Sequence, residues 1–137
     1  ALLMLSDLIQ SFSVYAPLGT ATDEKKPNDA LRVIISYVTE HYPEKITLND
    51  ISARIGFSKE YFCRFFKRSI GKTPIDYIND YRLNKVIRLL ETGDAPVTEI
   101  CLECGFNNMG NFQRLFKRKT GITPLQYRKL YLSKKSE

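Results

Sequence analysis

The chain has 137 residues, 43% of them hydrophobic, and a formal net charge of +6. This length suits one domain or two very small ones, and no apolar run reaches the ~18 residues that a membrane span requires. The positive charge favours a polyanionic partner, with a solvated basic surface as the alternative.

Residues 1–27 differ in composition from the rest of the chain. Residues 1–14 place apolar side chains such as Leu5, Leu8 and Phe12 at helical spacing, and residues 16–27 have the Gly, Pro, Thr and charge content of a linker. Residues 1–5 lack the positive flank and cleavage site of a signal peptide. We expect residues 1–27 to be the end of a preceding domain and a linker, in a fragment of a longer protein.

A helix is expected next, from about Asp29 to His41. Apolar residues recur along it at helical spacing, including Leu31, Ile34 and Val38. The single histidine of the chain, His41, ends this helix, where a partner for the helix dipole is a more ordinary role than a catalytic base.

The phrase FFKRSIGKTP at 65–74 returns as LFKRKTGITP at 115–124. Extended backwards, the match includes Gly56-Phe57 and Gly105-Phe106 at an offset of 49, and one inserted residue then changes the offset to 50. A single insertion in a turn leaves the flanking helices intact, so the pattern predicts a structural repeat.

Each copy of the repeat predicts a helix, a tight turn and a second helix. In the first copy, Thr47 with Asp50 resembles a capping box, and Gly56 is a natural helix stop. Ser58 then caps the second helix, which ends at Gly71. The dipeptides Thr-Pro at 73–74 and 123–124 begin the helices that follow, with proline at the first helical position.

Between the two copies, residues 74–91 have a helical pattern that closes at 92–96 with TGDAP. About 18 residues at ~1.5 Å each make a helix of roughly 27 Å. Two units joined in this way can place two helices about one duplex turn apart, near 34 Å. No segment has the pattern of a strand, so an all-α fold is predicted.

The cysteines are interpreted as packing residues. Their odd number argues against a disulfide framework and for a reducing cytosol. Cys101 and Cys104 form a C-x-x-C, but only Cys63 and His41 remain as further ligands and neither has a paired spacing. Cys101 takes the place of Ser52 in the repeat, where two helices must cross closely. We therefore predict no metal, no cofactor and no catalytic site.

The stretches ISARIGFSKEYFCRFFKRSIGKTPIDYI and VTEICLECGFNNMGNFQRLFKRKTGITPLQYR resemble the AraC/XylS family of bacterial transcription regulators. The resemblance covers about residues 28–132. It implies seven helices, with two helix-turn-helix units bridged by a long helix. It further implies sequence-specific binding of double-stranded DNA in an activator, contact with RNA polymerase, a cytoplasmic, nucleoid-associated location, and dimerisation through an N-terminal effector-binding domain that is missing here.

The expected domains follow from this resemblance. Residues 28–132 form the DNA-binding domain, divided into a first unit (28–73), a linker helix (74–92) and a second unit (93–132), and residues 133–137 form a basic tail.

The side chains expected to contact DNA lie on the second helix of each unit, which the resemblance places in the major groove. Arg64 and Arg114 suit guanine O6/N7, Gln113 suits adenine and Glu60 suits cytosine N4. For each arginine the alternative is a phosphate contact or a surface ion pair. The base-reading candidates are Glu60, Cys63, Arg64, Met109, Gly110, Gln113 and Arg114. The phosphate candidates are Ser58, Lys59, Lys67, Arg68, Asn108, Lys117, Arg118, Lys119 and Thr123.

Two departures from the family pattern lie at the start of the second reading helix. Asn111 stands where the family usually has an aromatic residue, and Gly110 loosens the first turn. Three rival functions remain. An adaptor would need an exposed apolar groove, an enzyme would need convergent acid, base or nucleophile groups, and a binder of single-stranded RNA would need exposed aromatic rings.

Overall fold

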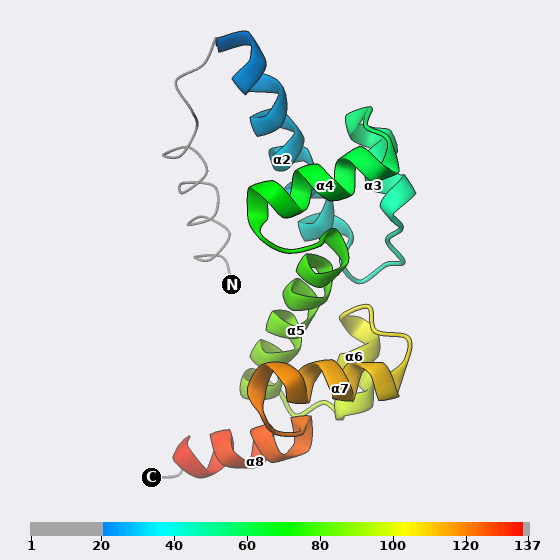
Figure 1. Ribbon diagram of the computed structural model, residues 1–137. Coiled ribbons are helices and arrows are strands. Elements are labelled where there is room, and N and C mark those ends of the chain that lie inside the picture. The colour runs from blue at the N-terminus through cyan, green and yellow to red at the C-terminus, as the bar shows by residue number, and fades with distance from the viewer. Residues whose placement is uncertain (1–20, 136–137) are drawn as a thin grey trace. The chain divides into compact units, whose positions relative to one another are not determined.

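The computed structural model describes the backbone of residues 21–135 and the side chains of residues 28–134. Within this range the chain is entirely helical apart from turns, which confirms the all-α prediction (Figure 1). The helices are α2 (Ala21–His41), α3 (Leu48–Ile55), α4 (Lys59–Ile70), α5 (Pro74–Thr92), α6 (Val97–Glu103), α7 (Met109–Thr120) and α8 (Pro124–Lys135).

Contacts divide the described residues into two compact units, with the boundary between Ile78 and Asn79. The boundary falls inside α5, the helix that the sequence predicts as the linker. The first unit contains α2, α3, α4 and the start of α5; the second contains the rest of α5 with α6, α7 and α8.

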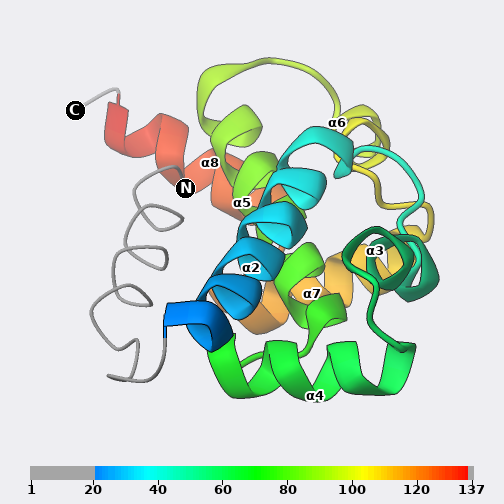
Figure 2. The same cartoon turned by 90° about the horizontal axis from the view of Figure 1, so that it is seen from above.

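The core of the first unit forms where α2, α3 and α4 turn their apolar faces toward one another (Figure 2). The aromatic stripe of α4 is buried, and the Phe66 ring meets the Tyr77 ring of α5 edge-on at 5.4 Å between centroids. The other buried side chains include Leu31, Ile34, Val38, Ile51, Phe62 and Phe65. The apolar side chain of Ile75, at the start of α5, is 54% exposed and does not join the core.

Local sequence signals set the helix ends of the first unit. The Thr47 amide donates to the Asp50 carboxylate and the Asp50 amide donates to Thr47 Oγ1, both at 3.1 Å, so the predicted capping box is present. Gly56 ends α3 at φ 72°, a left-handed conformation that residues with a Cβ rarely adopt. Ser58 Oγ accepts from the Tyr61 amide at 3.2 Å, which confirms it as the cap of α4.

The second unit repeats this arrangement. Phe112 and Phe116 of α7 are fully buried, and the other buried side chains of this unit include Leu83, Val86, Leu90 and Ile100. Thr123 and Gln126 exchange two hydrogen bonds of 3.0 and 3.2 Å at the start of α8, as their spacing predicts. The Tyr127 hydroxyl donates to the Glu91 carboxylate at 2.5 Å, and this bond, together with burial and the Glu91 charge, raises the pKa of Tyr127 to about 12.

The first described helix is longer than the sequence predicts. It begins at Ala21, whereas the sequence predicts a start near Asp29, so residues 21–27 are helical; that they form a linker stays a prediction. Glu24, Lys25 and Lys26 are polar, which suggested a linker, but Glu and Lys also have high helix propensity. The composition of this segment is therefore compatible with either structure. The helix expected within residues 1–14 lies outside the described residues, and the domain boundary near residue 27 stays a prediction.

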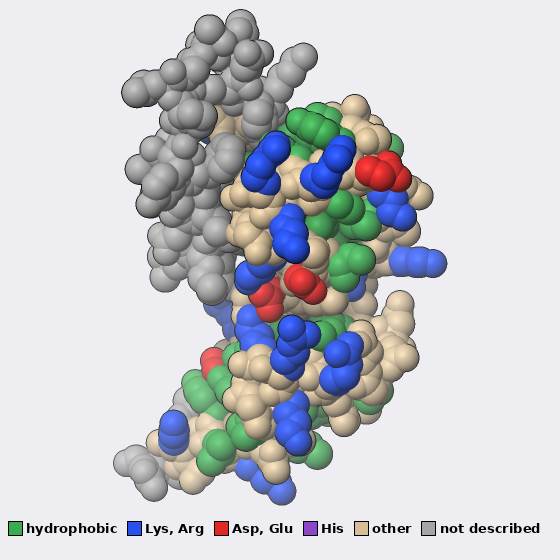
Figure 3. Space-filling model, viewed as in Figure 1, with side chains coloured by type: hydrophobic (Ala, Val, Ile, Leu, Met, Phe, Trp, Pro, Cys, Tyr) green, Lys and Arg blue, Asp and Glu red, His purple; other side chains and the backbone are tan. Residues whose placement is uncertain are grey.

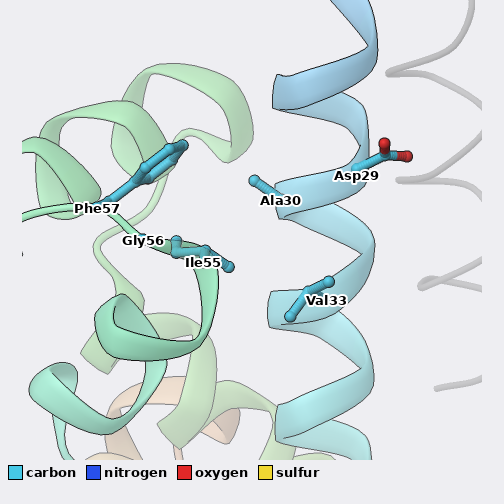
Figure 4. Close-up of a pocket in the computed structure, with 6 residues that line it drawn as sticks. All are labelled: Asp29, Ala30, Val33, Ile55, Gly56 and Phe57. Atoms are coloured by element: carbon cyan, nitrogen blue, oxygen red, sulfur yellow. The ribbon is translucent and has the colours of Figure 1, made fainter.

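The first unit also has an open cleft of about 390 Å³ between α2 and the turn after α3 (Figure 4). Ala30 and Val33 of α2 face Ile55, Gly56 and Phe57 across it, with Asp29 at its edge.

The second unit differs at the corresponding place. When the buried positions 31, 34 and 38 are aligned with 83, 86 and 90, Arg82 and Lys85 correspond to Ala30 and Val33. The positive charges of both residues oppose the rise that burial gives the pKa of the Cys104 thiol, and Phe106, the counterpart of Phe57, is 4% exposed. The second unit therefore has long cationic side chains at the positions where the first unit has Ala30 and Val33.

Candidate nucleic-acid interface

The second helix of the first unit, α4, separates a buried aromatic stripe from a polar outer stripe. Phe62, Phe65 and Phe66 lie in the core, so the opposite positions face solvent. Glu60, Arg64 and Lys67 are exposed and follow one another at i, i+4 and i+7 on the same face. Cys63 lies beside them and is partly buried.

The corresponding helix of the second unit, α7, has the same division. Phe112 and Phe116 are buried, whereas Gln113, Arg114 and Lys117 are exposed. Gly110 is also exposed and Met109 is partly buried. Leu115, the counterpart of the buried Phe65, is only partly buried. Each predicted base-reading set therefore lies on one helix, mainly on its solvent side.

Basic side chains collect in the last turns of both helices. Lys67 and Arg68 end α4, and α7 ends with Lys117, Arg118 and Lys119. In Figure 3, Lys and Arg side chains lie over α4 and over α7. A cation at a helix C-terminus is also favoured by the helix dipole, so this placement alone does not assign a phosphate contact.

Two of the predicted cations have partners within the second unit. Arg114 donates from a terminal guanidinium nitrogen to Asn111 Oδ1 at 2.7 Å. The Lys119 ammonium lies 3.2 Å from the Asp80 carboxylate on α5. The Arg114 bond follows from i, i+3 spacing on a helix and could have been found in the sequence. The Lys119 pair joins residues 39 apart and could not.

The polar residues predicted at helix N-termini act as caps. Ser58 and Asn108 accept from backbone amides at the starts of α4 and α7, and Thr123 does so at the start of α8. Their side-chain oxygens satisfy helix amides that would otherwise lack partners. Capping is thus confirmed for Ser58 and Thr123, and a phosphate contact at these three residues stays a prediction.

The C-x-x-C has the environment of a packing motif. Cys101 and Cys104 are each 1% exposed, and the Cys101 thiol lies 3.7 Å from the Phe106 carbonyl oxygen, to which it donates. Burial raises the pKa of both thiols, that of Cys104 to about 11. Ser52, the counterpart of Cys101, is likewise buried. Since the thiolate is the form that attacks electrophiles, burial makes both thiols less reactive than an exposed cysteine.

Among the described residues, no group of three or more His, Cys, Asp or Glu side chains is placed to hold a metal ion. In the same part of the chain, every helix is too short or too polar to cross a bilayer. The cleft beside α2 is an apolar groove of the kind an adaptor would use, and its lining residues belong to neither α4 nor α7. A protein contact there and a nucleic-acid contact on α4 and α7 do not exclude each other.

A family model described as a helix-turn-helix domain, of the AraC type, matches residues 51–130. The chain belongs to the AraC family. The match includes both α4 and α7, the two helices whose outer stripes are polar.

Relatives of this AraC-type domain are bacterial regulators. The uncharacterized HTH-type transcriptional regulator YdeC of Bacillus subtilis is 38% identical over 100 residues, which cover 73% of this chain and 34% of YdeC. The HTH-type transcriptional activator RhaS of Klebsiella pneumoniae is 32% identical over 111 residues, which cover 80% of this chain and 40% of RhaS. The chain thus spans well under half the length of these relatives.

A solved structure shows the same fold with DNA. The DNA-binding domain of AdpA, a global transcriptional factor, in complex with a target DNA, matches with a TM-score of 0.73 and 29% identity over 79% of this chain and 96% of that chain. The resemblance to AraC/XylS regulators stated from the sequence is confirmed, and the chain contains the DNA-binding domain of an AraC-type bacterial transcription regulator.

Proposed function

We propose that this domain binds double-stranded DNA with sequence specificity by inserting α4 and α7 into successive major-groove segments. One observation carries the proposal: each helix buries a phenylalanine stripe and exposes a polar stripe centred on an arginine, Arg64 or Arg114. The complex of AdpA with its target DNA supports a DNA-binding role for this fold.

Within this proposal the exposed stripes read bases and the helix ends hold phosphates. Arg64 and Arg114 present bidentate forks to guanine, Gln113 pairs with adenine, and Glu60 accepts from cytosine. Cys63, Met109 and Gly110 line the same surfaces and meet base edges through apolar contact. Phosphates are held by Ser58, Lys59, Lys67, Arg68, Asn108, Lys117, Arg118, Lys119 and Thr123, which set register without carrying sequence information.

The helix between the two units suits a bipartite site. α5 has 19 residues and a length of about 28 Å at ~1.5 Å per residue, comparable with the ~34 Å of one duplex turn. The proposed operator therefore has two contacted tracts about one turn, or ~10 bp, apart.

The next proposals concern the longer protein of which this chain is a part. RhaS, a relative covering most of this chain, is named an activator, which favours activation here. We propose that the protein works in the cytoplasm on the nucleoid, contacts RNA polymerase, and dimerises through an effector-binding domain outside this chain. We propose no catalytic activity.

Selection of bound sequences from random duplex DNA, followed by footprinting, tests the DNA proposal. Arg64→Ala should relax base preference in one tract and Arg114→Ala in the other, each at a cost of about 1–3 kcal/mol if the contact is bidentate. Lys117→Ala, the phosphate-type control, should weaken all sequences about equally. If both arginine variants alter the same tract, or neither alters base preference, the bipartite arrangement is wrong.

A further inference from the structure

We propose that Asn111 is a positioning residue that holds the Arg114 guanidinium in place for base reading in the second unit. The inference rests on the proposed function of Arg114 and deepens it. It concerns the position at which this sequence has an amide where the family usually has an aromatic ring.

The geometry of the first turns of α7 carries the inference. Asn111 Oδ1 accepts from an Arg114 terminal nitrogen at 2.7 Å, a short bond for a charged donor. The backbone N–H of Asn111 donates a hydrogen bond to the capping oxygen, Asn108 Oδ1, at 2.9 Å. The acceptor that holds Arg114 therefore belongs to a residue whose backbone is fixed by the helix cap.

The bond leaves most of the arginine available for DNA. A guanidinium has five N–H donors, and the bond to Asn111 uses one nitrogen, so donors remain for a two-pronged contact with guanine. A free arginine side chain must give up rotamer freedom when it contacts a base, and a side chain that is already held gives up less. The held arginine is thus prepared to distinguish bases.

An amide is the suitable acceptor for this role because it is neutral. A carboxylate at position 111 would hold Arg114 at least as well, but it would neutralise the arginine and repel nearby phosphates. Asn111 holds the guanidinium and leaves its full charge for DNA.

The repeat provides an internal comparison. The counterpart of Asn111 at the offset of 50 is Tyr61, just as the counterpart of Arg114 is Arg64. The Tyr61 ring packs edge-on against Phe57 at 4.8 Å and parallel to Phe65 at 6.3 Å between centroids. The same position thus extends an aromatic cluster in the first unit and holds the arginine in the second.

The first test measures the hold itself in the free domain, without DNA. The order parameters of the arginine Nε–H groups are measured by ¹⁵N relaxation in the wild type and in Asn111→Ala. Arg114 should be more ordered than Arg64 in the wild type and should fall to the level of Arg64 in the variant. Equal order in both proteins would overturn the proposal even if Arg114 reads a base.

The second test measures what the hold does for recognition. The domain is bound to its selected duplex and to duplexes altered at the base pair that Arg114→Ala identifies. Asn111→Ala and Asn111→Tyr should each reduce discrimination at that pair about 3–10-fold, within the usual coupling between contacting residues. Asn111→Asp should preserve discrimination but weaken binding to all sequences. Each variant keeps the backbone amide that Asn108 caps, so the helix start is retained.

A double variant separates positioning from direct contact. In the Arg114→Ala background, Asn111→Ala should change discrimination no further. If it still does, Asn111 contacts a base itself and the positioning role is overturned. If Asn111→Ala changes nothing while Arg114→Ala does, Arg114 reads its base without help and only this inference fails. If Arg114→Ala leaves discrimination intact, both the assignment of Arg114 and this inference fail.

Discussion

Corresponding side chains in the two units perform the same local task with different chemistry. Ser58 and Asn108 both cap a reading helix through a side-chain oxygen. Ser52 and Cys101 are both small side chains at the same buried position of the repeat. Such pairs explain residues that in isolation suggest a catalytic or metal-binding role, the C-x-x-C above all.

The three thiols are expected to react at very different rates. Cys63 is partly exposed on the outer side of α4, whereas Cys101 and Cys104 are buried and their pKa values are raised, that of Cys104 to about 11. Since the thiolate is the reactive form, one thiol per native chain should react quickly with a disulfide reagent at pH 8, and the other two only after unfolding.

The assignment of the fast thiol can be checked by substitution and by DNA. Cys63→Ser should remove the fast phase, and bound operator should slow the reaction of Cys63 in the wild type. Fast reaction of all three thiols in the folded chain would contradict the packing role of the C-x-x-C.

At the scale of the helices, local residues determine the helix ends, and the first turn of α7 contains a residue with low helix propensity. α3, α4 and α7 each stop at a glycine with φ between 72° and 87°. Within α7, however, Gly110 occupies the first turn, where it costs backbone entropy that an alanine would not.

Two glycine substitutions in the second unit should have opposite effects on stability. Gly110→Ala should stabilise the fold by up to about 1 kcal/mol, because a Cβ there meets only the Asn108 side-chain oxygen at 3.4 Å, an ordinary contact. Gly121→Ala should destabilise it by about 1–2 kcal/mol, because its φ of 86° is strained for a residue with a Cβ. Urea unfolding without DNA measures both, and a loss of stability in Gly110→Ala would show that α7 requires glycine there for packing.

At the scale of the whole molecule, charge is the property that the two units share. The chain has a net charge of +6, and basic residues end both α4 and α7. Lys119 is already paired with Asp80, so its charge is partly used within the protein. The other basic residues in the last turns of α4 and α7 are therefore the ones we expect to attract a polyanion.

The affinity for duplex DNA should therefore fall steeply with salt. Each phosphate contact releases about 0.9 of a counterion, so log K should fall linearly with log salt concentration, and Lys117→Ala should make the slope shallower by about 0.9. Lys129→Ala on α8 is the matched control: it removes an equally exposed lysine outside the proposed interface and should change the slope less. Affinity that hardly changes with salt would count against the phosphate contacts proposed here.

The sequence alone determined the features that depend on neighbouring residues. The repeat, the capping box at Thr47, the glycine stops and the division of α4 into a phenylalanine stripe and a polar stripe all follow from spacing and from the intrinsic conformations of individual residues. These are also the features that establish the AraC-type fold and locate the candidate DNA-reading helices. They could be predicted because a helix places residues three and four apart on one face whatever surrounds it.

Only the tertiary structure decided what each face meets. Ile75 has the apolar character of a core residue but is exposed. The pair of Lys119 with Asp80 and the open cleft beside α2 likewise depend on residues far apart in the chain. Periodicity specifies which residues share a face; the volume and charge of side chains brought together by folding determine whether that face is buried, paired or left open.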